Sequence, residues 1–290
     1  MVEVTNLTKR FGEKVVVDNT TWTAKDGHIT GFIGHNGAGK TTSLKMITGA
    51  LKPTEGTIKL NGIDIRKDHL EAKKQFGYVS DSPDHFLRLK GIEYVNLMAD
   101  IYDDPGDGRA DRIKTFAERL GIYDALDSTI LSYSHGMRQK IMLIGALVHN
   151  PSIWILDEPM LGLDPQSAYE LKQMMKEHVA NGNSVLFSTH VLEVAEKLCD
   201  EVLIIKKGQM QFTGSVDALK EKYASDDLEE YKDDARLLIE DMPTIDIVRC
   251  KECRWASPNK EGDYDCKCHI PIFRVDAEGY CYLADRKESE

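Results

Sequence analysis

The chain has 290 residues, of which 41% are hydrophobic and 29% charged, as in a soluble globular protein with one large domain or two modest ones. Its net charge of −11, from 37 basic and 48 acidic residues, argues against non-specific binding to nucleic acid or to an anionic membrane surface. No apolar run approaches the about 20 residues of a membrane helix, and the start lacks a signal-peptide core, so we expect a cytosolic protein.

Strand and helix patterns alternate from the start of the chain. β-Branched residues at 15–22 predict a strand, and the apolar run that ends at Gly34 predicts a second, buried strand. Helical spacing follows at Leu44, Ile47 and Leu51, and an LNG turn after that separates two short strands.

The middle of the chain continues this alternation. Residues 83–148 have helical periodicity, and the apolar run SIWILDEP predicts a buried strand. Pro165 is expected at the first position of the next helix, and two further strands, SVLFSTH and EVLIIKKG, flank a helix at 191–198. Strands that alternate with helices predict a mainly parallel sheet with crossover connections.

A glycine-rich loop joins the buried strand to the first helix. It reads GHNGAGKT and fits G-x-x-x-x-G-K-[ST], in which backbone N–H groups and a helix N-terminus surround phosphate oxygens. Lys40 would reach the β- and γ-phosphates, and Thr41 would ligate Mg²⁺. The loop residues expected to bind ATP are Gly34, His35, Asn36, Gly37, Ala38, Gly39, Lys40, Thr41 and Thr42.

Two acids follow the strand at 153–156. A phosphate-binding loop needs an acid that holds the magnesium shell, which we expect to be Asp157. The adjacent carboxylate of Glu158 can polarise an attacking water.

A third motif, LSYSHGMRQK, spans Leu131–Lys140, and with it the chain resembles the nucleotide-binding subunit of an ABC transporter. The family's signature is usually LSGGQ, and this chain retains only the serine and the second glycine. The matching residues are Tyr133, Ser134, His135, Gly136 and Met137.

Other positions acquire roles from this resemblance, which covers residues 2–223. Phe11 matches the aromatic platform for adenine, and Asp164, which ends LGLD, matches the D-loop at the dimer interface. His190 matches the switch histidine, so the implied catalytic residues are Glu158, His190 and Lys40. The implied fold is an α/β P-loop NTPase of ABC type, with a mainly parallel core sheet, an antiparallel β subdomain and a helical subdomain at about 83–148.

One position departs from the family pattern. The family usually has a glutamine after GY-x-P that touches magnesium and senses the transmembrane partner, whereas this chain has GYVSDSPDHF. We expect Asp81 to approach Mg²⁺ through water, because a carboxylate is a hard ligand. The alternative is that Asp81 is only a turn residue before Ser82 and Pro83.

The end of the chain looks different from the ATPase part. After a 1–223 domain and an acidic linker or helix at 224–248, residues 249–290 resemble cysteine-rich tails of small phage-type proteins. Their spacing predicts a small segment stabilised by one zinc ion, with free thiols, an iron–sulfur cluster or disulfides as alternatives. The candidate ligands are Cys250, Cys253, Cys266, Cys268 and Cys281, and His269 could replace one thiolate.

The resemblance implies a subunit that powers a membrane transporter, of an exporter type. Two copies, identical or different, would enclose two ATP molecules, each between one copy's phosphate loop and Ser134–Gly136 of the other. The permease would be a separate polypeptide that docks on the helical subdomain and holds the ATPase at the inner face of the cell membrane. Alternatives are a soluble ABC ATPase that acts on ribosomes or nucleic acid, although no nucleic-acid partner is expected, and a zinc-dependent interaction protein with an ATPase switch.

Overall fold

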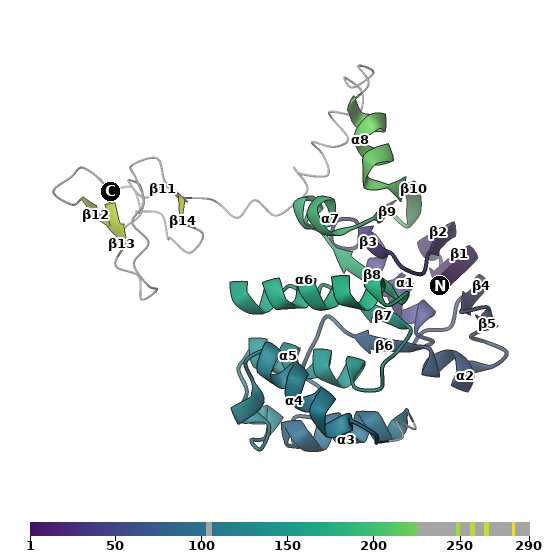
Figure 1. The fold of residues 1–290 in the computed structure, drawn as a ribbon. Helices are drawn as coiled ribbons and strands as arrows, with labels where there is room; N and C mark the ends of the chain where they lie inside the picture. Colours follow the sequence, from purple (N-terminus) through teal and green to yellow (C-terminus); the bar gives the residue numbers. More distant parts are fainter. Residues whose placement is uncertain (103–105, 225–247, 250–255, 259–263, 267–279, 282–290) are drawn as a thin grey trace. The chain divides into compact units, whose positions relative to one another are not determined.

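The computed structural model describes residues 1–102, 106–224, 248–249, 256–258, 264–266 and 280–281 (Figure 1). The chain divides into two units, Met1–Leu228 and Glu229–Glu290.

A six-stranded sheet forms the centre of the first unit, in the order β10-β9-β3-β8-β7-β6. Neighbouring strands are parallel except that β10 pairs antiparallel with β9. Every residue of β3, β7 and β8 is buried, which explains their continuous apolar runs and confirms the predicted parallel core. The strands are β3 (Ile29–Ile33), β6 (Phe76–Val79), β7 (Ile153–Leu156), β8 (Ser184–Thr189), β9 (Glu201–Lys206) and β10 (Gln209–Ser215).

A second, antiparallel sheet has the strand order β2-β1-β4-β5. The strand predicted at 15–22 is the middle of β2, whereas β1 was not predicted, because its polar residues alternate irregularly and several bulges interrupt its pairing. The strands are β1 (Val2–Phe11), β2 (Lys14–Ala24), β4 (Glu55–Leu60) and β5 (Ile63–Asp64).

Eight α-helices and two short 3₁₀ helices, η1 and η2, complete the described part of the chain. Figure 1 shows α3, α4 and α5 grouped beyond the β6 edge of the central sheet, as the predicted helical subdomain requires. Pro165 is the first residue of α6, as predicted. The helices are α1 (Lys40–Ile47), α2 (His69–Lys74), α3 (Gly91–Ile101), α4 (Arg109–Arg119), η1 (Tyr123–Ala125), η2 (Ile130–Ser132), α5 (His135–Leu147), α6 (Pro165–Ala180), α7 (Leu192–Leu198) and α8 (Val216–Ala224).

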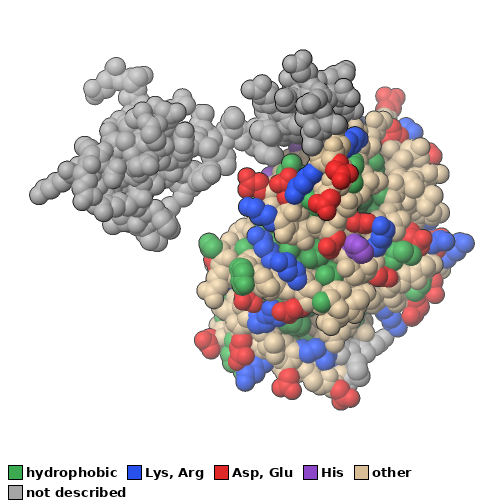
Figure 2. Space-filling model, turned by 45° about the horizontal axis from the view of Figure 1, so that its top comes forward, with side chains coloured by type: hydrophobic (Ala, Val, Ile, Leu, Met, Phe, Trp, Pro, Cys, Tyr) green, Lys and Arg blue, Asp and Glu red, His purple; other side chains and the backbone are tan. Residues whose placement is uncertain are grey.

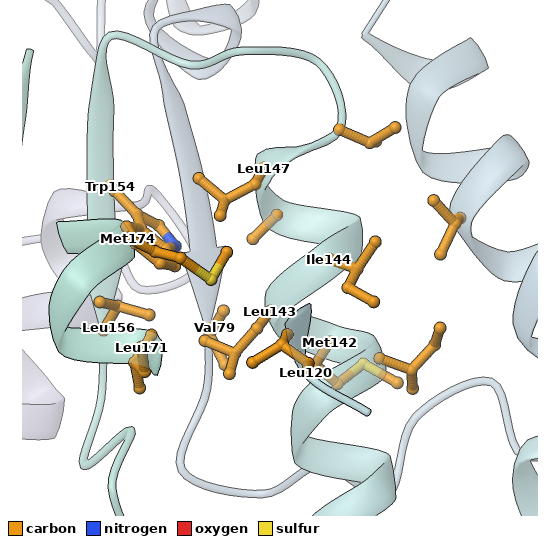
Figure 3. Close-up of a cluster of buried hydrophobic side chains, with 14 of the residues drawn as sticks. Val79, Leu120, Met142, Leu143, Ile144, Leu147, Trp154, Leu156, Leu171 and Met174 are labelled. Carbon is orange, nitrogen blue, oxygen red and sulfur yellow. The ribbon is translucent and has the colours of Figure 1, made fainter. Parts of the chain in front are cut away.

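One apolar cluster joins the helical subdomain to the central sheet. Figure 3 shows side chains of α5, such as Leu143 and Leu147, meeting Trp154 of β7 and Met174 of α6. Close approach also matters here, because a Cβ atom on Gly77 of β6 would lie 1.9 Å from the carbonyl oxygen of Ala146. The helical subdomain is therefore packed directly on β6 and on β7, the strand that ends at the two acids.

A second cluster lies between the two sheets and includes Leu44 and Ile47 of α1, two of the three residues whose helical spacing was predicted. Leu51, the third, is partly buried against the same cluster. Burial of these side chains anchors α1, and with it the loop that precedes the helix.

The second unit contains two short antiparallel strand pairs. Val248 of β11 (Val248–Arg249) lies opposite Cys281 of β14 (Tyr280–Cys281). Ala256 of β12 (Ala256–Pro258) lies opposite Cys266 of β13 (Tyr264–Cys266). The other zinc candidates, Cys250, Cys253, Cys268 and His269, lie outside the described residues.

The described part of the chain contains no helix with the length and apolar character that would be needed to cross a membrane.

Leu143 provides a test of the core that joins the helical subdomain to the sheet. Its side chain is fully buried, so Leu143→Ala should lower the free energy of unfolding by about 2–5 kcal/mol, through lost transfer energy and the cavity left behind. Urea denaturation of the full chain measures the change. The control is Leu70→Ala on α2, where the side chain is 64% exposed and the change should stay within about 0.5 kcal/mol. Equal effects of the two substitutions would contradict this description of the core.

Candidate active site

The phosphate-binding loop connects β3 to α1, as its sequence predicts. Gly37 and Gly39 have φ angles of +80° and +112°, a region that favours glycine. A Cβ atom on Gly39 would lie 2.9 Å from the carbonyl oxygen of Val16, and one on Gly34 would lie 2.5 Å from that of Ile205. These glycines let the loop pass close to the neighbouring backbone.

The start of α1 is suited to an anion. No side chain caps this helix, and its first turn contains no acidic residue. The backbone N–H groups of the first turn and the positive end of the helix dipole therefore remain available for phosphate oxygens.

Lys40 is buried inside the loop, with only 5% of its side chain exposed. Its Nζ atom donates to the carbonyl oxygens of Gly34 and His35, the latter at 3.2 Å. The same atom lies 3.4 Å from Oε1 of Glu158. A buried ammonium group is thus held by two loop carbonyls and one carboxylate, a set that a phosphate could replace.

Asp157 is completely buried where β7 ends. Burial raises the pKa of its carboxyl group. The hydrogen bond from Ser188 and the nearby Thr41 hydroxyl lower this pKa, whereas the charges of Asp81 and Glu158 raise it further. The Ser188 hydroxyl donates to Oδ1 at 2.5 Å, but Oδ2 is buried with no hydrogen-bond partner. A buried carboxylate oxygen without a partner is suited to a cation.

The oxygen donors at this edge fit a magnesium ion. Thr41, Asp157 and Asp81 supply a hydroxyl group and carboxylates, which are hard ligands. Among the described residues, no three His, Cys, Asp or Glu side chains form a metal cage. That is compatible with Mg²⁺, because this ion usually binds one or two carboxylates together with water and substrate phosphates.

Glu158 has a strained backbone, with φ at +48°. Its N–H group donates to the Ser188 hydroxyl at 2.9 Å, so Ser188 holds both acids. The Glu158 carboxylate lies between two nitrogens: Nδ1 of His190 is 3.1 Å from Oε2, and Lys40 faces Oε1. The structure therefore brings together Lys40, Glu158 and His190, the three residues whose catalytic role the sequence predicts.

Ser188 was missed by sequence reasoning. Its only signal is that it is a polar residue directly after the apolar run of Val185, Leu186 and Phe187. It is fully buried, where an unpartnered hydroxyl would be costly, and the two acids satisfy it.

Asp81 lies on the exposed segment that follows β6. The charge of Asp81 contributes to the raised pKa of Asp157. The pKa of Tyr78 is raised mainly by burial, next by the charge of Asp157 and then by that of Asp81. Asp81 follows Val79 by two residues, and the Val79 carbonyl oxygen accepts the N–H of Asp157 at 2.9 Å.

Phe11 is 51% exposed at the end of β1, with Lys9 Nζ 4.9 Å from the centre of its ring. It pairs with Lys14 across the hairpin to β2, the strand whose Val16 touches the phosphate loop. An exposed aromatic ring at this place can stack on a flat base.

The signature segment begins α5. Ser134 caps the helix by accepting the N–H of Met137 at 3.3 Å, and Ser134 and His135 are exposed. Tyr133 is instead buried, and its hydroxyl donates to the Ala125 carbonyl oxygen at 2.6 Å. A Cβ atom on Gly136 would lie 2.6 Å from the Gly162 carbonyl oxygen, so this segment packs against the loop after Glu158.

Asp164 has a clear role within its own chain. It caps α6 by accepting the N–H and hydroxyl of Ser167, at 2.9 and 2.7 Å, and it pairs with Lys140 Nζ at 2.8 Å. The hydrogen bond from Lys140, followed by those from Ser167, lowers the pKa of Asp164. Neither Lys140 nor Ser167 was predicted to be a partner.

The comparisons with known proteins agree with this geometry. Residues 17–161 match the family model described as ABC transporter. The chain is 33% identical over 227 residues to the ABC-type transporter ATP-binding protein EcsA of Bacillus subtilis, covering 78% of this chain and 92% of EcsA. It is 31% identical over 233 residues to the ABC transporter ATP-binding protein NatA of the same organism, covering 79% of this chain and 95% of NatA.

A solved structure of an ATP-binding subunit of an ABC transporter has a TM-score of 0.74 and 31% identity, and the match covers 77% of this chain and 93% of that one. The phosphate loop, the two acids with His190 and the helical subdomain with its signature segment thus occur together in a chain of matching sequence and fold. The chain belongs to the ABC transporter family, as an ATP-binding ATPase.

Proposed function

We propose that this ATPase drives a separate transmembrane permease by binding and hydrolysing ATP between two ATPase subunits. The observation that carries the proposal is the convergence of Lys40, Glu158 and His190 beside Asp157. The exposed N-terminus of the signature helix supports the second half of the arrangement, in which Ser134–Gly136 of one subunit contact the nucleotide of the other.

We expect ATP binding to change the ion pair that Lys40 forms with Glu158. The γ-phosphate of ATP would replace Glu158 as the partner of Lys40, because both are anions that compete for one buried ammonium group. Glu158 is then free to accept a proton from the attacking water. Nδ1 of His190 lies 3.1 Å from the other carboxylate oxygen of Glu158, and we expect His190 to contact the γ-phosphate.

Magnesium, when bound, neutralises charge on the phosphates and helps to orient them. Thr41 and Asp157 would hold it, with Asp81 acting through water. Asp157 suits this role because its carboxylate keeps one oxygen without a hydrogen-bond partner. Phe11 would stack on the adenine, and the loop from Gly34 to Thr42 would surround the phosphates.

Glu158→Gln tests the chemical step. The amide retains the shape of the side chain but cannot accept the proton, so hydrolysis should fall by about 10²-fold or more, as expected for loss of a general base. ATP binding should persist, and the variant should accumulate as an ATP-bound dimer. Steady-state ATPase assays and size-exclusion chromatography with ATP measure both effects. Hydrolysis at the wild-type rate would rule out Glu158 as the base.

The helical subdomain is the proposed docking place for the permease. Leu97 and Ile101 lie one turn apart on α3 and are 37% and 58% exposed. The same subdomain has a hollow of about 880 Å³ between α3, α4 and η1, with both apolar and charged walls. Among the residues that line it are Ile92, Asn96, Arg109, Ile113, Tyr123 and Leu126. A mainly apolar cytoplasmic helix of a permease fits such a surface.

The surface charge does not favour nucleic acid as the partner instead. Figure 2 shows a face of the described part on which Lys and Arg side chains are mixed with Asp and Glu, without a continuous basic area. The net charge of −11 also argues against a nucleic-acid partner. We therefore propose a membrane permease as the partner and a peripheral location on the inner face of the cell membrane. The GYVSD form of the segment that begins in β6 leads us to propose transport in the export direction.

Affinity purification of the full chain from detergent-solubilised membranes tests the choice of partner. A multi-span membrane protein should co-purify in comparable amount, and Ile101→Glu should reduce its recovery because a charge would replace an apolar contact. The matched control is Leu70→Glu, an equally exposed leucine on α2, outside the helical subdomain. Recovery of ribosomes or nucleic acid without a membrane protein would overturn the proposal.

We also propose that the second unit binds one zinc ion through Cys250, Cys253 and Cys281, with Cys266 or Cys268 as the fourth ligand. The strand pairings support this, since Cys281 lies opposite Val248, two residues before Cys250 in the sequence. Cys266 lies opposite Ala256, three residues after Cys253 in the sequence. Four thiolates from two sequence-distant pairs form a closed tetrahedral site.

The zinc proposal predicts about one zinc per full-length chain purified under reducing conditions. Chelation should remove structure from 249–290 and leave ATP binding unchanged, because a small metal site contributes its own folding energy. A chain that ends at residue 228, where the first unit ends, should retain ATPase activity. Metal analysis and ATPase assays measure these outcomes. Protein without metal would refute the zinc site, and a folded but inactive truncation would refute the independence of the two units.

A further inference from the structure

The signature segment is tied to the segment that follows β6 by contacts that the nucleotide chemistry does not require. Ile130 N donates to the Leu89 carbonyl oxygen at 2.9 Å, and Leu131 N donates to that of Leu87 at 2.8 Å. Lys90 and Thr129 add an antiparallel bridge. Residues 87–90 and 129–131 therefore lie side by side.

Arg138, on the first turn of α5, joins both segments through its side chain. Nη1 donates to Asp84 Oδ1 at 2.6 Å, Nη2 to the Leu131 carbonyl oxygen at 2.8 Å and Nε to that of Ile130 at 3.3 Å. A guanidinium group presents its donors in a rigid fork, and this fork reaches three acceptors on two segments. A lysine would keep the charge but could not reproduce this geometry.

The two segments lead to different parts of the nucleotide machinery. Asp84 follows Asp81 by three residues, and the buried Pro83 lies between them. The same segment contains a turn in which the Ser80 hydroxyl donates to the Ser82 carbonyl oxygen at 2.7 Å. Asp81 in turn follows Val79 by two residues, and the Val79 carbonyl oxygen accepts the N–H of the buried Asp157 at 2.9 Å. On the other side, Leu131 precedes Ser134 by three residues.

The ion pair itself contributes little to stability, because the Asp84 side chain is 55% exposed and water screens the pair. The geometric restraint is the more important consequence. A short stiff segment connects Asp84 to Asp81, and the first turn of a packed helix connects Arg138 to Ser134, so a shift at either end is transmitted to the other.

We propose that Arg138 is a positioning residue that makes Asp81 and the signature segment move as one piece. Through Arg138, the metal side of a subunit's own ATP site is coupled to the surface that the subunit presents to its partner's nucleotide. The inference rests on the proposed function, in which Asp81 approaches magnesium and Ser134–Gly136 contact the ATP of the other subunit.

Kinetics of the full-length chain test this coupling. The variants are Arg138→Lys, Arg138→Gln, Asp84→Asn and the double variant of Arg138→Gln with Asp84→Asn. The matched control is Arg88→Gln, at an exposed arginine of the same segment. For each, the readouts are the Mg²⁺ concentration for half-maximal ATPase rate, the Hill coefficient for ATP and the melting temperature.

Each Arg138 variant and Asp84→Asn should raise the half-maximal Mg²⁺ concentration by about three- to tenfold, the range typical of residues that couple two sites. The Hill coefficient should fall towards one, while the melting temperature of Asp84→Asn stays within about 2 °C of wild type, because water screens the ion pair at the exposed Asp84. The double variant should be no worse than the single variants, because all of them break the same link. The Arg88→Gln control should behave as wild type.

Wild-type behaviour of Arg138→Lys in both kinetic readouts would overturn the inference, since the lysine retains only the charge. Additive effects of Arg138→Gln and Asp84→Asn, or a fall in melting temperature with unchanged magnesium dependence, would also overturn it. These results differ from a failure of the proposed function, in which the wild-type chain itself shows no Mg²⁺-dependent hydrolysis or Glu158→Gln hydrolyses ATP normally.

Discussion

Parallel pairing of β3 with β8 and of β8 with β7 is the constraint on which the site depends. In this register Ile33 lies beside Thr189, and Leu156 lies beside Phe187, so the three strands end at one edge of the sheet. The phosphate loop follows the first strand, His190 the second and the two acids the third. Side chains separated by more than a hundred residues in sequence thereby come within hydrogen-bonding distance.

At this edge of the sheet, the carboxylate of Glu158 contacts both Lys40 and His190. Burying an unpaired charge is costly, and here Nζ of Lys40 lies 3.4 Å from Oε1 of Glu158, while Oε2 of Glu158 lies 3.1 Å from Nδ1 of His190. ATP would thus substitute one anion for another around a lysine that is already desolvated. The strained backbone of Glu158 belongs to the same arrangement, since Ser188 holds its N–H group while it also donates to Asp157.

The helical subdomain adds a second level of organisation. Its core is continuous with the central sheet, and Gly77 allows α5 to approach β6 closely. Lys140 and Arg138, both near the start of α5, pair with acids on two different loops, Asp164 after β7 and Asp84 after β6. The first turns of α5 are thus paired with both loops that flank the site, so side-chain contacts fix the start of the signature helix relative to both.

The amino-acid sequence by itself determined the buried strands β3, β7, β8 and β9, the phosphate loop, the two acids and the start of α6 at Pro165, because each of these is a local pattern. It also identified His190, although only through resemblance to a family. It did not reveal β1, whose irregular polar pattern makes sense only beside β2 and β4. Only the tertiary structure decided that Ser188 joins the two acids, that Lys40 pairs with Glu158, that Tyr133 is buried and that Asp164 binds Lys140. The physical reason is that these contacts join elements far apart in the chain, whose approach depends on strand register and helix packing, and no local pattern encodes either.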